Sequence, residues 1–191
     1  MIITKPRLIT PMSDFLVGVS RSNCRNSDLC DHLRRLSITL PEVTEPKSIR
    51  FICLSVPVQP GSLVKLLAKE KTAPCRNGAN YFLGYLKEVT EGDVPPEIRD
   101  CHLVAYDPES LIVSSSGLQA FLCCRRDGKG TRNLDIAFGT NGWSDKWAFL
   151  VEDAVTVSKP VEPANHLSAT EDTTRIYTEE TTLIHTGNVA T

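Results

Sequence analysis

The sequence lacks several features that would assign it to a particular class of protein. Its 191 residues carry a formal net charge of -2 at pH 7, so no overall field attracts nucleic acid or anionic lipid. Apolar runs such as Trp147–Val151 are far shorter than the roughly 20 residues that a membrane-spanning helix needs. Lys5, Pro6 and Arg7 stand where a secretory signal would be apolar. We therefore expect a protein that is not secreted and stays in the cytoplasm.

Signatures of enzymes and of metal sites are also scarce. The four histidines are scattered, and no HExxH, CxxC or GxSxG motif occurs. Gly128-Lys129-Gly130 lacks the GxxxxGK[ST] frame of a phosphate-binding loop, so a hairpin tip is the simpler interpretation. Cys24, Cys30 and His32 would need a fourth ligand to hold zinc. The sequence therefore predicts no enzyme activity, no cofactor and no metal.

The cysteines fit a reducing compartment. There are seven, an odd number, and their spacing is irregular. Cys123 and Cys124 are adjacent, so they cannot easily pair with each other. Cys53 and Cys123 lie inside apolar runs, where a free thiol behaves as a small hydrophobic side chain. We expect reduced thiols.

From Ser37 onward, short apolar runs alternate with turn residues, a pattern that favours an all-β sandwich or barrel. Strands are expected at 37–40, 48–58, 101–108, 110–116, 117–125, 133–140 and 147–157. GSLVKLLAKEK (61–71) fits either a helix capped by Ser62 or a strand, and YFLGYLKEVT (81–90) fits a strand or a short helix. SDLCDHLRRL (27–36) has helical spacing.

The composition divides the chain into three parts. Residues 1–36 form a mildly basic segment, residues 37–160 hold the β domain, and residues 161–191 form an acidic, threonine-rich tail. Both tryptophans lie near the end of the β domain, in GWSDKWAFLVEDAVTVSKP (142–160). Trp147, Phe149 and Val151 share one parity with Val155 and Val157, so this stretch is predicted to be a strand facing the core.

Four cations surround a predicted hairpin tip. Asp127-Gly128 is a signal for a tight turn, since glycine supplies a positive φ. The cations are Arg125, Arg126, Lys129 and Arg132. Four positive charges within eight residues can contact successive phosphates of a single-stranded nucleic acid, and solvated charges on a turn are the alternative.

Two further pairs of cations are candidates for the same role. Lys65 and Lys69 would share one face if 61–71 is helical, although such a face is often only solvated. Arg34 and Arg35 belong to the basic N-terminal segment. We include all four as candidate phosphate contacts.

The order of these elements, together with a few local strings, resembles the thirty-kilodalton superfamily of plant-virus cell-to-cell movement proteins, in particular the short tombusvirus members. RRLSITL and SIRFICLSVPV look like the first strands of that family, and GSLVKLLAKEK looks like its glycine-led strand. CHLVAYDPESLIVSS and SDKWAFLVEDAVTVSKP look like later strands, the second with a lysine-tryptophan pair. The likeness covers about residues 35–160, but the family's aspartate has no counterpart and the tail is acidic.

The resemblance implies a mainly β fold, namely a jelly-roll-like antiparallel β-sandwich with one or two short helices and flexible termini. It also implies a protein that binds single-stranded RNA and carries the viral genome through plasmodesmata of the host cell. The implied partners are RNA, further copies of the protein, host membrane or plasmodesmal proteins, and the viral coat protein. A small viral coat protein with a jelly-roll fold is the alternative, and a cellular interaction domain or silencing suppressor is a third class.

Overall fold

The fold is described from a computed structural model that covers residues 1–22, 38–108, 112–113, 119–138 and 142–154. These residues belong to a unit that runs from Met1 to Val155. The helix expected at 27–36, the cysteine and histidine residues near it, and the acidic tail lie outside the described residues.

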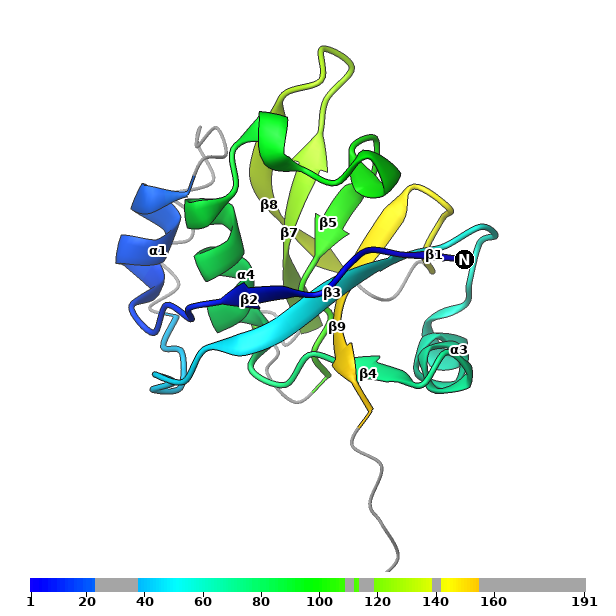
Figure 1. The fold of residues 1–191 in the computed structure, drawn as a ribbon, viewed down its shortest axis with the longest axis horizontal. Helices are drawn as coiled ribbons and strands as arrows, with labels where there is room; N and C mark the ends of the chain where they lie inside the picture. Colours follow the sequence, from blue (N-terminus) through cyan, green and yellow to red (C-terminus); the bar gives the residue numbers. More distant parts are fainter. Residues whose placement is uncertain (23–37, 109–111, 114–118, 139–141, 155–191) are drawn as a thin grey trace, which may run out of the picture. The chain divides into compact units, whose positions relative to one another are not determined.

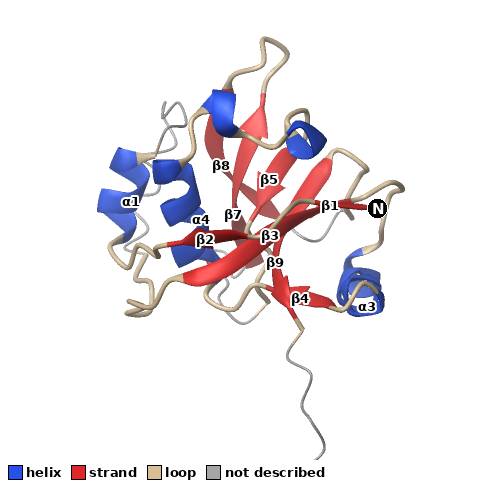
Figure 2. Cartoon of the chain, in the orientation of Figure 1, coloured by secondary structure: helices blue, strands red, loops and turns tan. Residues whose placement is uncertain are grey.

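The centre of the fold is a mixed β-sheet (Figures 1 and 2). Its strands are β1 (Ile2–Ile3), β2 (Arg7–Ile9), β3 (Lys47–Cys53), β4 (Thr72–Pro74), β5 (His102–Val104), β6 (Ile112–Val113), β7 (Gln119–Arg126), β8 (Arg132–Phe138) and β9 (Trp147–Asp153). The order is β1-β3-β9-β5-β7-β6, while β2 joins β3, β4 joins β9 and β8 joins β7. The mainly β prediction is therefore confirmed.

One pairing departs from the antiparallel sheet that was expected. β5 runs parallel to β9, with Leu103 opposite Ala148, whereas the other paired strands are antiparallel. Parallel neighbours need a long connection between them. Here the chain from β5 to β9 passes through β6, β7 and β8 before it returns beside β5.

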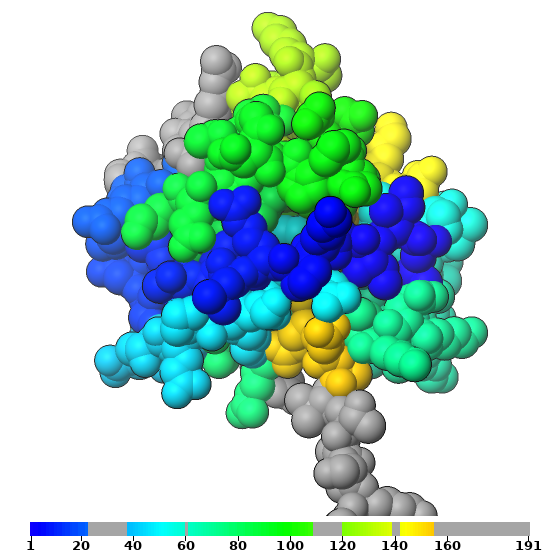
Figure 3. Space-filling model, viewed as in Figure 1, coloured from blue at the N-terminus to red at the C-terminus, as the bar shows by residue number. Residues whose placement is uncertain are grey.

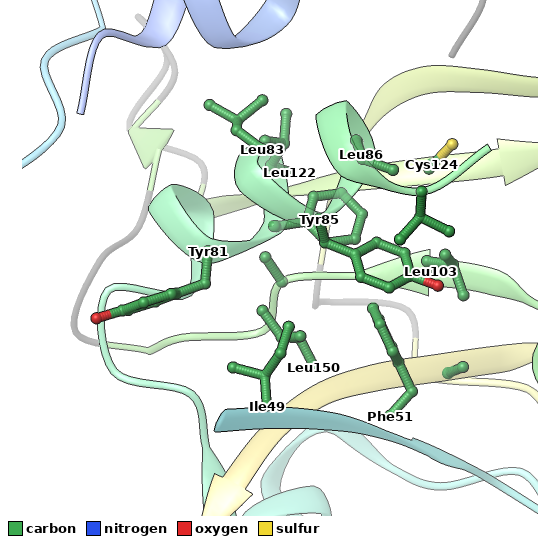
Figure 4. Close-up of a cluster of buried hydrophobic side chains, with 14 of the residues drawn as sticks. Ile49, Phe51, Tyr81, Leu83, Tyr85, Leu86, Leu103, Leu122, Cys124 and Leu150 are labelled. Atoms are coloured by element: carbon green, nitrogen blue, oxygen red, sulfur yellow. The ribbon is translucent and has the colours of Figure 1, made fainter. Parts of the chain in front are cut away.

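One face of the sheet is covered by helix α4 (Gly78–Glu88), which is buried from Gly78 to Leu86. Tyr85 of α4 packs edge-on against Phe51 of β3, with ring centroids 4.9 Å apart. Leu103, Leu122 and Leu150 bring β5, β7 and β9 into the same cluster (Figure 4). Residues 81–90, for which a strand or a short helix was expected, thus belong mainly to a buried helix.

The N-terminal residues cover the other side of α4. Helix α1 (Phe15–Arg21) begins at Asp14, whose carboxylate accepts a hydrogen bond from Val17 N–H (2.9 Å). Gly84 lets the chain after β2 approach α4 closely, because a Cβ there would lie 2.1 Å from the Thr10 carbonyl oxygen. Part of the predicted basic segment, residues 1–22, therefore contributes β1, β2 and α1 to the same unit as the sheet.

The opposite face of the sheet is covered by helix α3 (Leu63–Lys69) and an aromatic cluster. Leu63 and Leu67 are fully buried, so the helical alternative at 61–71 holds for most of that segment. They pack in the same cluster as Trp147, Phe149 and Val151 of β9. The prediction that these three residues share a core-facing side is confirmed, while Ala148 and Leu150 face the α4 cluster. Val155 and Val157 lie outside the described residues.

The strand expected at 37–40 does not form over its described residues. Residues 38–40 have no regular secondary structure. Ile38 and Leu40 pack against the α4 cluster instead. The Pro41 carbonyl accepts a hydrogen bond from the side-chain amide of Asn80 (2.9 Å), which anchors this segment to α4 rather than to a strand.

Candidate nucleic-acid interface

The β7–β8 hairpin projects from the surface of the described unit and carries four of the predicted RNA-binding cations (Figure 3). Its loop, residues 127–131, is longer than the tight Asp127-Gly128 turn that was expected. Asp127 N–H donates to the Thr131 carbonyl (2.9 Å), and the Asp127 carboxylate accepts from the backbone N–H groups of Lys129 and Thr131 (2.9 and 2.8 Å). The positive φ falls on Gly130 (84°). These hydrogen bonds, the one from Thr131 first, lower the pKa of Asp127.

Arg132 begins β8 at the base of the hairpin loop, opposite Arg126, and is buried, with 5% of its side chain exposed. Its guanidinium donates to the carbonyls of Cys101 (3.0 Å), Ile98 (3.2 Å) and Arg99 (2.8 Å). The Glu91 carboxylate lies 3.2 Å from Nε. Because the guanidinium is already bound to the segment before β5, Arg132 cannot serve as the phosphate contact that the sequence predicted.

Arg125 and Arg126 are more accessible, and each has a carboxylate partner. Arg125 is 46% exposed, lies 2.6 Å from Asp135, and stacks over the Trp147 ring (5.6 Å to the centroid). Arg126 is 23% exposed, lies 2.8 Å from Asp100, and also donates to the Arg99 carbonyl. Their guanidinium groups are therefore held at the base of the hairpin loop.

Lys129 is exposed in the loop of the hairpin. Its backbone N–H donates to the Asp127 carboxylate, which fixes the loop around it. Lys129 thus belongs to the loop, whereas the other three predicted cations of the hairpin lie on its two strands.

A groove of about 620 Å³ runs beside the hairpin. It is lined by Asp100, Cys101, His102, Arg126, Asp127, Gly128, Asp145 and Lys146. The lining carries two full positive charges, on Arg126 and Lys146, against three carboxylates, so the groove itself is not a basic channel. Lys146, which is exposed in this lining, is a cation that was not among the predicted contacts.

His102 forms part of the wall of this groove. Its Nδ1 accepts a hydrogen bond from the Arg126 backbone N–H (3.0 Å), and its ring packs against Trp147 with centroids 5.1 Å apart. Burial, followed by the nearby charges of Arg125, Lys146 and Arg132, lowers the pKa of His102. The imidazole is therefore neutral at pH 7, and it acts as an acceptor that fixes the end of β7 at Arg126.

The position of Lys146 beside the hairpin follows from the pairing of the strands. His102 lies opposite Trp147 in the parallel β5–β9 pair, and His102 N–H donates to the Lys146 carbonyl (2.8 Å). This pairing places Lys146 beside the hairpin base. In the sequence its one signal was the lysine-tryptophan pair of the movement-protein resemblance.

The other predicted contacts are not brought to this interface. Lys65 and Lys69 are exposed on α3, well away from the hairpin (Figure 1). Arg34 and Arg35 lie outside the described residues, as do Cys24, Cys30 and His32.

Metal ligands and membrane spans are not found in the part of the chain that the structure describes. No group of three or more His, Cys, Asp or Glu side chains with metal-binding geometry occurs among these residues. Within the same residues, no helix is both long enough and apolar enough to cross a membrane. No protein-family model, curated protein or solved structure matches the chain.

Proposed function

We propose that the protein is a non-enzymatic viral movement protein that binds single-stranded RNA along the outer edge of the β7–β8 hairpin. The observation that carries this proposal is the projecting loop with Lys129 exposed, beside which Lys146 is also exposed at the rim of the groove. Cations on a projecting edge suit a flexible single strand, whose phosphates follow one another along its backbone.

Arg125 and Arg126 can join these lysines because their present ion pairs are weak. Both pairs are in contact with solvent, and an exposed ion pair contributes only about 0–1 kcal/mol to stability. An RNA phosphate can therefore replace Asp135 or Asp100 as the partner of the guanidinium. Arg132 is excluded from this set, since its donors are bound to buried backbone carbonyls.

The carboxylates of the groove determine where the strand lies. Asp100, Asp127 and Asp145 outnumber the two cations of the lining and repel phosphate from the groove, so we place the RNA on Lys129 of the loop and on Lys146. Trp147 is 9% exposed beneath Arg125 and offers little ring surface for base stacking. Binding then rests on phosphate contacts, and we expect little preference for RNA sequence.

The resemblance to movement proteins supplies the setting of this activity. In that setting the protein carries viral RNA through plasmodesmata, associates with itself and with host membrane or plasmodesmal proteins, and meets the coat protein. The finer fold that the resemblance implies is a jelly-roll-like sandwich. The parallel β5–β9 pair departs from an all-antiparallel sandwich, and the proposed RNA binding does not require a jelly roll.

The test compares two double variants that remove equal charge from two places. Lys129→Ala/Lys146→Ala removes the rim lysines, and Lys65→Ala/Lys69→Ala removes the α3 lysines. Fluorescence anisotropy with two labelled single-stranded RNAs of unrelated sequence gives the affinity at several salt concentrations. We expect the rim variant to bind more weakly, with a salt slope smaller by about 0.7 for each phosphate that it no longer neutralises. The α3 variant should bind as the wild type does.

Three results would contradict the proposal in different ways. Absence of RNA binding at low salt would remove RNA as the ligand. Weakened binding in the α3 variant alone would place the interface on α3 instead of the hairpin. Regular closed shells of the purified protein in electron micrographs would favour the coat-protein alternative over movement.

A further inference from the structure

Two buried cysteines from distant parts of the chain meet beside the groove. Cys53 ends β3, and Cys101 immediately precedes β5. Their sulfur atoms lie 3.0 Å apart, although the residues are 48 positions apart in sequence. A disulfide bond is about 2.05 Å long, so closing the pair needs a movement of roughly 1 Å.

Strand pairing accounts for this meeting. Cys53 of β3 and Leu103 of β5 both lie opposite Ala148, on either side of β9. Cys101 lies two residues before Leu103, just before the start of β5. Both cysteines belong to the hydrophobic cluster around α4. The close approach is thus set by the sheet itself and not by an exposed loop.

The pair is also reachable from solvent on one side. Cys101 lines the groove of about 620 Å³ beside the hairpin, and 7% of the residue is exposed. Cys75, by comparison, is completely buried. Burial, followed by the hydrogen bond with Cys53, raises the pKa of Cys101 to about 12, so the group is a thiol at pH 7 and reacts slowly.

We propose that Cys53 and Cys101 are an oxidation site at which a peroxide converts two thiols into a disulfide that fastens β3 to the start of β5. Cys101 attacks one peroxide oxygen, the O–O bond breaks, and a sulfenic acid and one water result. The Cys53 sulfur then attacks the sulfenic sulfur, and the S–O bond breaks to release a second water. The two sulfurs lose two electrons to the peroxide, and a thiol reductant reverses the reaction.

The disulfide would stabilise the wall of the groove. It would close a loop that contains α3, β4 and α4 and ends at the segment to which Arg132 donates its hydrogen bonds. A cross-link of this span restricts the unfolded chain far more than the folded one. We expect the oxidised protein to melt about 10 °C above the reduced protein.

Peptide mapping of the full chain after treatment with hydrogen peroxide tests the site directly. Trypsin releases Phe51–Lys65, which contains Cys53 alone, but it leaves Cys101 in one peptide with Cys123 and Cys124. A second cut after Glu109 separates Cys101 from those two. We expect a peptide pair joining Cys53 to Cys101, lighter by two hydrogens than the sum of its parts and released by a thiol reductant.

Variants provide the control. Cys53→Ala and Cys101→Ala should abolish both the linked pair and the rise in melting temperature, whereas Cys75→Ala should preserve both. Recovery of Cys53 unlinked while Cys101 is trapped as a sulfenic acid by dimedone would overturn the proposal. A disulfide that joins Cys53 mainly to any other cysteine would also overturn it. Peptide mapping of the wild-type protein alone is enough to detect that result.

Discussion

The base and the tip of the loop that joins β7 to β8 carry cations in opposite environments. At the base, Arg132 is buried and donates to three backbone carbonyls. At the tip, Lys129 is exposed. The two residues are three positions apart in sequence, yet one holds the fold together and the other is available to a ligand. Local charge therefore says little about binding until the burial of each side chain is known.

The segment that Arg132 binds explains why this difference matters. Residues 91–101 connect α4 to β5 through the short helices η2 (Glu91–Asp93) and η3 (Pro96–Ile98). Their carbonyls at Ile98, Arg99 and Cys101 turn toward the hairpin base and need donors. A planar guanidinium supplies several donors at once, which an ammonium group cannot do in the same geometry.

The largest expected effect comes from replacing the buried cation. Arg132→Met removes the donors and leaves the carbonyls and Glu91 without them, so we expect a loss of about 3 kcal/mol in the free energy of unfolding. Lys129→Met should change this quantity by less than about 0.5 kcal/mol. Urea denaturation of both variants measures the difference. Equal stability of the two would break the comparison and return Arg132 to the set of ligand contacts.

A smaller effect is expected from the two glycines of the loop. Gly130 has φ 84°, and an added Cβ would lie 3.1 Å from Nη2 of Arg126. Gly130→Ala should therefore cost about 1–2 kcal/mol. A Cβ on Gly128 would meet nothing within 4 Å, so Gly128→Ala is the matched control. If Gly128→Ala lowered the free energy of unfolding more than Gly130→Ala in the same denaturation measurement, the turn would be a tight one centred on Gly128.

The strands were easier to predict from the sequence than the helix α4. β3 and β9 are apolar runs bounded by turn residues, and both were expected. β9 is buried on both faces, whereas the pattern predicted one core-facing side. α4 is buried on all sides because the sheet and α1 enclose it, and such a helix lacks the polar stripe that distinguishes an amphipathic helix from a buried strand.

The sequence could predict only part of how the cations of the candidate interface are arranged, because the rest depends on long-range strand pairing. The hairpin and its exposed tip follow from local turn chemistry. The burial of Arg132 depends on carbonyls about 30 positions away, at Cys101 and its neighbours. The addition of Lys146 depends on the parallel β5–β9 register. Neither arrangement follows from the local sequence pattern around the residue concerned.

The smallest expected effect is a dependence of stability on pH that arises at the base of the hairpin. Burial lowers the pKa of His102 below its ordinary 6.5, so the folded protein binds a proton less readily there than the unfolded chain. Stability is then fully present above pH 6.5 and declines as the pH falls below that value toward the folded pKa. The pKa values of Asp93 and Asp127 are lowered too, but from an ordinary 3.8, so these carboxyl groups change the stability only at a pH below that value. Thermal melts of the wild type and His102→Gln between pH 7 and 5 should converge as the pH falls, because the variant lacks this proton uptake. Curves that stay parallel would show that His102 titrates alike in the folded and the unfolded state.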